Sequence, residues 1–161
     1  MNSIESGMEN STVSISAVPI SAVSIPIDQR IAYLLLRVIA GMDFFGHGFA
    51  RIFTGTHLGG FAHWMVGDMA KAPLPASLVL VIGYVVPWVE LAVGLMLLFG
   101  VGVRFALVTA LLLMLLLMFG ITMKQDWTVA GQQLLYSLVL AVLLFGRERL
   151  DVSWSGLLHR R

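Results

Sequence analysis

Four ionisable side chains lie within stretches of sequence that are otherwise apolar. Asp43, His47 and Arg51 follow one another at intervals of four residues, which places all three on one face of a helix. Glu90 lies in a second apolar stretch, three residues after Pro87. Carboxylates and imidazoles transfer protons, and a guanidinium binds anions through several N–H donors. These residues could line a buried polar site for proton or small-anion chemistry, with Glu90 and His47 as the candidate catalytic groups.

Two further polar residues are candidates for contact with a substrate. Gln132 and Tyr136 share one face of the fourth apolar stretch and could hydrogen-bond toward the core. Together with Arg51 and Asp43 they form the predicted substrate-binding set.

A purely structural role for the charged residues is the alternative interpretation. Asp43 could pair with His47 or Arg51, and Glu90 could pair with one of them across two helices, so that the set only fixes helix register. A charge near the centre of a membrane costs at least about 2.5 to 3.5 kcal/mol. Under either interpretation the groups should therefore face the interior and find partners.

The composition identifies the environment of these residues as lipid. The chain has 161 residues, enough for one domain, and 58% of them are hydrophobic while 12% are charged. Soluble domains carry about 25% charged residues. A small domain keeps much of its surface exposed, so a chain this apolar cannot hide its surface in water.

Charge and cysteine content exclude several functions. A net charge of +1 without a basic stripe argues against nucleic acid as a partner. The absence of cysteine excludes disulfides, iron–sulfur clusters, c-type haem attachment and thiol redox chemistry in this chain. Histidine and carboxylate ligands on facing helices are too few for a b-type haem or a di-metal site. No metal or covalently bound cofactor is predicted, whereas a quinone needs only an apolar slot, a donor and a proton source.

Four long apolar runs predict an all-α integral membrane protein. They cover residues 31–53, 78–99, 105–121 and 129–145. Each is long enough to cross the hydrocarbon core as a helix, and none has the alternating polarity of a barrel strand. Short connections after the second and third runs make neighbours antiparallel, so we expect an up-down-up-down four-helix bundle.

The connection between the first and second runs is longer and amphipathic. Within residues 54–76, four apolar residues recur at helical spacing opposite three polar ones. The apolar set is Phe61, Trp64, Met65 and Met69, and the polar set is His63, Asp68 and Lys71. This pattern predicts a short interfacial helix on the membrane surface.

Two terminal segments flank the predicted bundle of residues 29–152. Residues 1–28 are rich in serine and lack the basic and apolar regions of a signal peptide, so we interpret them as a flexible tail. An extended arm that packs on a partner is the alternative. Residues 153–161 form a short basic tail.

The distribution of Lys and Arg predicts the orientation. Six of these residues flank the side that holds both termini, and three flank the opposite side. Positive residues accumulate on the cytoplasmic side of a membrane, so both termini should lie in the cytoplasm.

Ordered glycines, a proline and basic residues give the chain a resemblance to a known family. The first run carries Arg37-x3-Gly41-x5-His47-Gly48-x2-Arg51, the second carries Pro87-x2-Glu90-Leu91-x2-Gly94-x5-Gly100-x3-Arg104, and the end carries Gly146-x3-Leu150-Asp151. Over about residues 31–152 this order resembles the DoxX family. Asp43 is not a position of that pattern.

The resemblance implies a bacterial four-helix protein of the cytoplasmic membrane. Its DoxD-like branch is the large subunit of thiosulfate:quinone oxidoreductase, and other members act in membrane complexes with redox enzymes. Motif positions that the resemblance implies to be structural are Arg37, Gly41, Gly48, Pro87, Gly94 and Arg104.

Three functions are consistent with these features. The first is a membrane subunit of a quinone-linked redox system, of the thiosulfate:quinone oxidoreductase type, with a polar site between the first two spanning helices. The second is a non-catalytic anchor or assembly subunit that docks other membrane or peripheral subunits. A transporter ranks last, because a single four-helix unit lacks the inverted repeats that alternating access uses.

Overall fold

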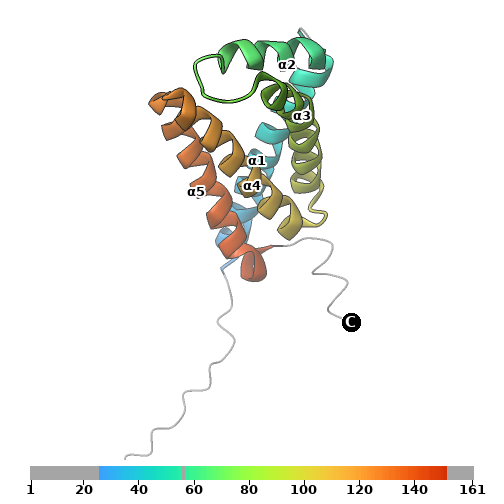
Figure 1. Ribbon diagram of the computed structural model, residues 1–161. Helices are drawn as coiled ribbons and strands as arrows, with labels where there is room; N and C mark the ends of the chain where they lie inside the picture. Colours follow the sequence, from blue (N-terminus) through green and yellow to red (C-terminus); the bar gives the residue numbers. More distant parts are fainter. Residues whose placement is uncertain (1–25, 56, 152–161) are drawn as a thin grey trace, which may run out of the picture.

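A computed structural model describes residues 26–55 and 57–151, and this part of the chain is entirely helical and irregular, without strands (Figure 1). Its five helices are α1 (Ile27–Phe53), α2 (His57–Asp68), α3 (Ala76–Phe99), α4 (Val103–Lys124) and α5 (Trp127–Leu150). The predicted terminal tails lie almost wholly outside the described residues. α1 begins at Ile27, two residues inside the segment that was predicted to be a tail.

Four of the helices, α1, α3, α4 and α5, are long and apolar enough to cross a membrane. The prediction of an all-α bundle with four spanning helices is therefore confirmed. Each helix extends beyond its apolar run at one or both ends, where polar residues such as Asp28 and Lys124 continue the helix. At 1.5 Å per residue the 24 residues of α3 reach about 36 Å.

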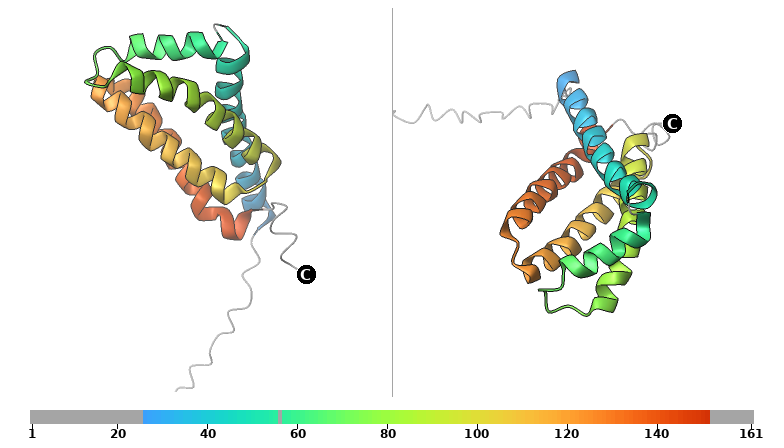
Figure 2. Two further views of the ribbon diagram at one scale, coloured as in Figure 1. Left: turned by 45° about the vertical axis from the view of Figure 1, so that its right-hand side comes forward. Right: turned by 90° about the horizontal axis from the view of Figure 1, so that it is seen from above.

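The spanning helices form a ring in which each one contacts two others. The contact between α1 and α3 is the most extensive. α3 also contacts α4, α4 contacts α5, and α5 contacts α1. α2 lies across one end of the ring against α1 and α3 (Figures 1 and 2). α1 and α5 are close at the opposite end and diverge toward α2 (Figure 2).

Glycines allow α1 and α3 to approach closely. A Cβ on Gly48 would lie 2.6 Å from the Pro87 carbonyl oxygen, and one on Gly94 would lie 2.6 Å from Cα of Phe45. A Cβ on Gly41 would lie 3.0 Å from Cβ of Leu97. Such contacts between helix backbones require small residues, so these glycines set the α1–α3 distance.

Gly46, two residues before Gly48, takes no part in this contact. Nothing lies within 4 Å of a Cβ placed on Gly46. Gly41 and Gly48 are seven residues apart and therefore share a face, whereas Gly46 points to another side of the helix.

A buried ion pair closes the end of the bundle at which both described chain ends lie. Arg37 Nη1 donates to Asp151 Oδ1 at 2.6 Å, and both side chains are buried. The guanidinium also fills the space beside Gly100, which ends α3 with φ of 69°. Beside it, the Tyr33 hydroxyl donates to the Leu143 carbonyl oxygen at 3.1 Å. These contacts join the start of α1 to the ends of α3 and α5.

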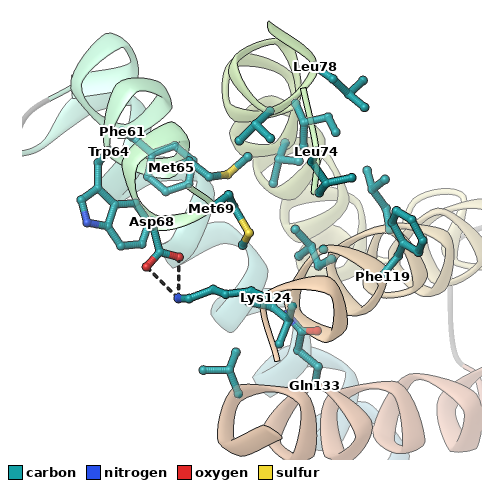
Figure 3. A pocket seen from close by; sticks show the side chains of 18 of the residues that line it. Phe61, Trp64, Met65, Asp68, Met69, Leu74, Leu78, Phe119, Lys124 and Gln133 are labelled. Atoms are coloured by element: carbon teal, nitrogen blue, oxygen red, sulfur yellow. Dashed lines mark hydrogen bonds and ion pairs between the residues drawn. The ribbon is translucent and has the colours of Figure 1, made fainter. Parts of the chain in front are cut away.

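The short helix predicted between the first two spans is present as α2, but its polar side differs from the prediction. His63 and Lys71 are exposed as expected. Asp68 instead turns toward α4, where Lys124 Nζ donates to its carboxylate at 2.7 Å (Figure 3). The helical pattern predicted that Asp68 faces solvent, because a pattern within one segment carries no information about Lys124, which comes from another helix.

Candidate functional site

Arg51 and Glu90 form an ion pair between the last turn of α1 and the middle of α3. Arg51 Nη1 donates to both carboxylate oxygens of Glu90. The Glu90 side chain is 5% exposed and that of Arg51 is 27% exposed. The close approach of α1 and α3 at Gly48 positions the two residues for this contact. A buried charge requires such a partner in a membrane protein.

Arg51 also contacts the helix that covers the bundle. Its guanidinium carbon lies 4.7 Å from the ring centroid of Phe61 in α2, the geometry of a cation–π contact. One side chain therefore links α1, α2 and α3.

His47 and Asp43 form a separate pair, one and two turns before Arg51 in α1. His47 Nε2 lies 3.7 Å from Asp43 Oδ1, which is longer than a hydrogen bond. Their side chains are 50% and 38% exposed, respectively. Within the described residues, Arg51 and Glu90 meet across the helices while His47 meets Asp43 on its own helix. His47 makes no hydrogen bond to Glu90.

A large cavity, here named the outer cavity, lies beneath α2 and is bordered by α3, α4 and α5 (Figure 3). Its volume is about 490 Å³. Its apolar lining includes Phe61, Trp64, Met65, Ile82, Phe119 and Val129. Small-molecule sites have this size and this predominance of apolar walls.

Few polar side chains reach the outer cavity. They are Arg51, the Asp68–Lys124 pair and Gln133. The Gln133 Oε1 atom is buried and has no hydrogen-bond partner within the described residues. A buried acceptor without a donor costs about 1 to 3 kcal/mol, so this carbonyl is suited to a ligand that donates to it.

The glutamine predicted from the sequence was the neighbouring residue. Gln132 is exposed and does not line the cavity, whereas Gln133 does. The sequence signal that distinguishes the two glutamines is the helix face on which each lies. Gln133 is two helical turns before buried Leu140 and therefore shares its face. Lys124 and the Phe61 contact with Arg51 were also missed, because both come from elements whose placement the sequence does not reveal.

Asp43 and Tyr136 meet at a second, smaller cavity. This cavity has a volume of about 170 Å³ and lies between α1 and α5. The predicted substrate-binding residues are thus divided: Arg51 lines the outer cavity, while Asp43 and Tyr136 line the smaller one. Within the described residues, no three His, Asp or Glu side chains gather as metal ligands would.

The residues that the resemblance implied to be structural occupy two kinds of position. Gly41, Gly48, Pro87 and Gly94 lie at the α1–α3 contact, and Arg37 lies in the buried pair at the closed end. Arg104 is exposed in the first turn of α4.

Four apolar spans, a buried intramembrane ion pair and an apolar cavity beneath a short cap define a helical integral membrane protein. Residues 32–124 match the DoxX family, and the chain belongs to it. The match contains the Arg51–Glu90 pair and ends at Lys124, before the Gly146–Asp151 segment that also resembled the family. Comparisons with curated proteins and with solved structures gave no match.

Proposed function

We propose that this DoxX-family protein is a membrane subunit of a quinone-linked redox system and that the outer cavity binds the quinone ring. The observation that supports this function is the cavity itself, which is large, apolar and bounded by Arg51 on one helix and Gln133 on another. A quinone ring has apolar faces and carbonyl oxygens at two ends, so it needs apolar walls and a few hydrogen-bonding groups.

The side chains of the cavity fit such a ring. Arg51 uses Nη1 for Glu90, and the rest of its guanidinium is available to donate to a carbonyl oxygen. The Gln133 amide can turn its NH₂ toward a carbonyl or its oxygen toward a hydroxyl, so it suits both the oxidised and the reduced ring. Phe61 and Trp64 provide aromatic surface beside the ring.

A bound quinone would supply a carrier of two electrons and two protons. Arg51 would hold and orient the ring, and Glu90, buried behind Arg51, would hold or accept a proton at its carboxylate. The electrons would come from another subunit of the system.

Thiosulfate fits this cavity less well than a quinone. Arg51 already carries the carboxylate of Glu90, and an anion beside it would meet that negative charge. A neutral ring avoids this repulsion. In our proposal any anionic substrate therefore binds to the partner subunit.

Quinone binding should depend on Gln133 and not on Gln132. We expect Gln133→Leu to weaken binding of a short-chain quinone about tenfold, because one hydrogen bond is lost. Gln132→Leu makes the same chemical change one residue away at an exposed position, so its affinity should equal that of the wild type. Quenching of tryptophan fluorescence in detergent measures both, since Trp64 lines the cavity.

Equal affinity in the two variants would contradict placement of the ring in the outer cavity. If no quinone co-purifies with native lipids and none quenches saturably, the quinone function itself is wrong. Stoichiometric partner subunits without quinone would then favour the assembly subunit.

The proposal also places both chain termini in the cytoplasm and the outer cavity near the opposite membrane surface. In the cysteine-free chain, Lys71→Cys should react with an impermeant thiol reagent added to intact cells, because Lys71 is exposed beside α2. Val101→Cys lies in the exposed turn at the other end and should react only after permeabilisation. Labelling of Val101→Cys in intact cells would show that the orientation is the opposite of the one proposed.

A further inference from the structure

α2 is attached to the rest of the bundle along one edge. In the middle of α2, Ala62 is fully buried, and a Cβ placed on Gly83 of α3 would lie 2.8 Å from the Ala62 Cα. α2 packs on α3 and α1, whereas within the described residues no Cα of α2 lies within 8 Å of a Cα of α4 or α5. α2 therefore has a fixed edge at α3 and a free edge that faces α4.

One ion pair holds the free edge of α2. Lys124 Nζ, at the end of α4, donates to both carboxylate oxygens of Asp68, at 2.7 and 2.9 Å (Figure 3). In the part of the chain that the structure describes, this pair is the one hydrogen-bonded link between α2 and α4. Both side chains line the outer cavity. The pair is therefore part of the cavity wall and fixes how far α2 lies from α4.

Lys124 has a second carboxylate within reach. Asp126 Oδ2 lies 3.7 Å from Lys124 Nζ, and Asp126 Oδ1 accepts a hydrogen bond from the Val129 amide at 3.2 Å. That bond caps α5 and fixes the Asp126 side chain in place. The lysine ammonium sits on a flexible four-carbon stem, so it can move to Asp126 when α2 moves away. Because the cation keeps a partner, releasing Asp68 costs less than breaking an isolated pair.

The segment after α2 can move together with it. The backbone hydrogen bonds described for the amides of residues 69–74 go to carbonyl oxygens of α2 or of the segment itself. None of them joins this segment to α4 or α5. The Asp68 end of α2 is therefore held to the far side of the outer cavity by the ion pair and not by its backbone.

We propose that α2 is a lid on the outer cavity and that transfer of Lys124 from Asp68 to Asp126 opens it. The contact between Ala62 and Gly83 is the pivot, and the end of α2 that carries Asp68 moves away from α4. The ligand enters and leaves between α2 and α4. This inference rests on the proposed function only in taking the outer cavity as a ligand site, and it does not depend on which ligand binds there.

A single thiol in the cavity tests the lid, because the chain has no cysteine of its own. Ile82→Cys places the thiol on the α3 wall of the outer cavity. Its rate of reaction with N-ethylmaleimide in detergent measures access to the cavity. Asp68→Asn keeps the shape of the side chain and removes its charge. In the Ile82→Cys chain we expect it to make the reaction about fivefold faster, since the ion pair that holds the lid is lost.

Asp126→Asn is the matched control for Asp68→Asn. It makes the same chemical change on the other partner of Lys124, and asparagine still caps α5. The open lid then lacks a carboxylate for Lys124, so the Ile82→Cys thiol should react more slowly than in the parent chain. A rate equal to or above that of the parent would overturn the transfer to Asp126.

A second thiol position distinguishes lid opening from unfolding. Ala106 in α4 is fully buried and does not line the outer cavity, so the thiol of Ala106→Cys should stay protected when Asp68→Asn is added. If both thiols gain reactivity equally, Asp68 stabilises the whole bundle and the lid is wrong. An unchanged rate at Ile82→Cys in the Asp68→Asn variant would also overturn the proposal. The maleimide reaction needs no bound quinone, so these results stand apart from the test of quinone binding.

Discussion

Gly48→Ala should strongly reduce the stability of the bundle. The new methyl group would lie 2.6 Å from the Pro87 carbonyl oxygen and 2.8 Å from Cα of Leu91, both backbone atoms of α3. Backbone atoms cannot rotate away, so α1 and α3 must separate along their main contact. Overpacking of this kind costs about 1 to 3 kcal/mol, and the rigid neighbours place Gly48→Ala at the upper end. Thermal unfolding in detergent measures the loss.

Gly131→Ala is the matched control for that substitution. Gly131 lies in α5, and a Cβ placed there has nothing within 4 Å. Since alanine favours a helix over glycine by up to about 1 kcal/mol, Gly131→Ala should leave the melting temperature unchanged or raise it. If Gly48→Ala and Gly131→Ala have the same melting temperature, α1 and α3 are not held at the distance described.

Removing Arg51 should cost more stability than removing Glu90. Arg51→Gln leaves Glu90, which is 5% exposed, without its cationic partner, and breaking a buried pair in this way costs about 3 to 5 kcal/mol. Glu90→Gln keeps an amide beside Arg51, which is more exposed and also contacts the Phe61 ring. We expect a loss of about 2 kcal/mol for Glu90→Gln. Unfolding of both variants in the same detergent gives the comparison.

The double variant separates structure from ligand binding. Arg51→Gln with Glu90→Gln leaves no unpaired charge, so part of the lost stability should return. Quinone retention should stay lost, because the guanidinium that donates to the ring is still missing. If retention returns together with stability, Arg51 acts only in helix register and its role in the proposed function is wrong.

The chemical types of the site residues were predictable because charge in an apolar run is unusual. Arg51 and Glu90 were identified for that reason, and the structure joins them. The sequence left the partner of each charge open: Asp43 could pair with His47 or with Arg51, and Glu90 with one of them across the helices. The structure joins Arg51 to Glu90 and leaves His47 beside Asp43, because the side-chain direction around α1 turns Arg51 toward α3.

The amino-acid sequence determined that lipid surrounds the protein, how many helices span the membrane, and that a short helix lies between the first two of them. These properties follow from local composition, since about 20 apolar residues must form a helix in lipid. The tertiary structure decided which glycines meet α3, that Gln133 rather than Gln132 faces the outer cavity, and that Asp68 meets Lys124. Each depends on the rotation of one helix against another. A rotation of 100° separates adjacent residues, and packing between distant segments, rather than local composition, selects it.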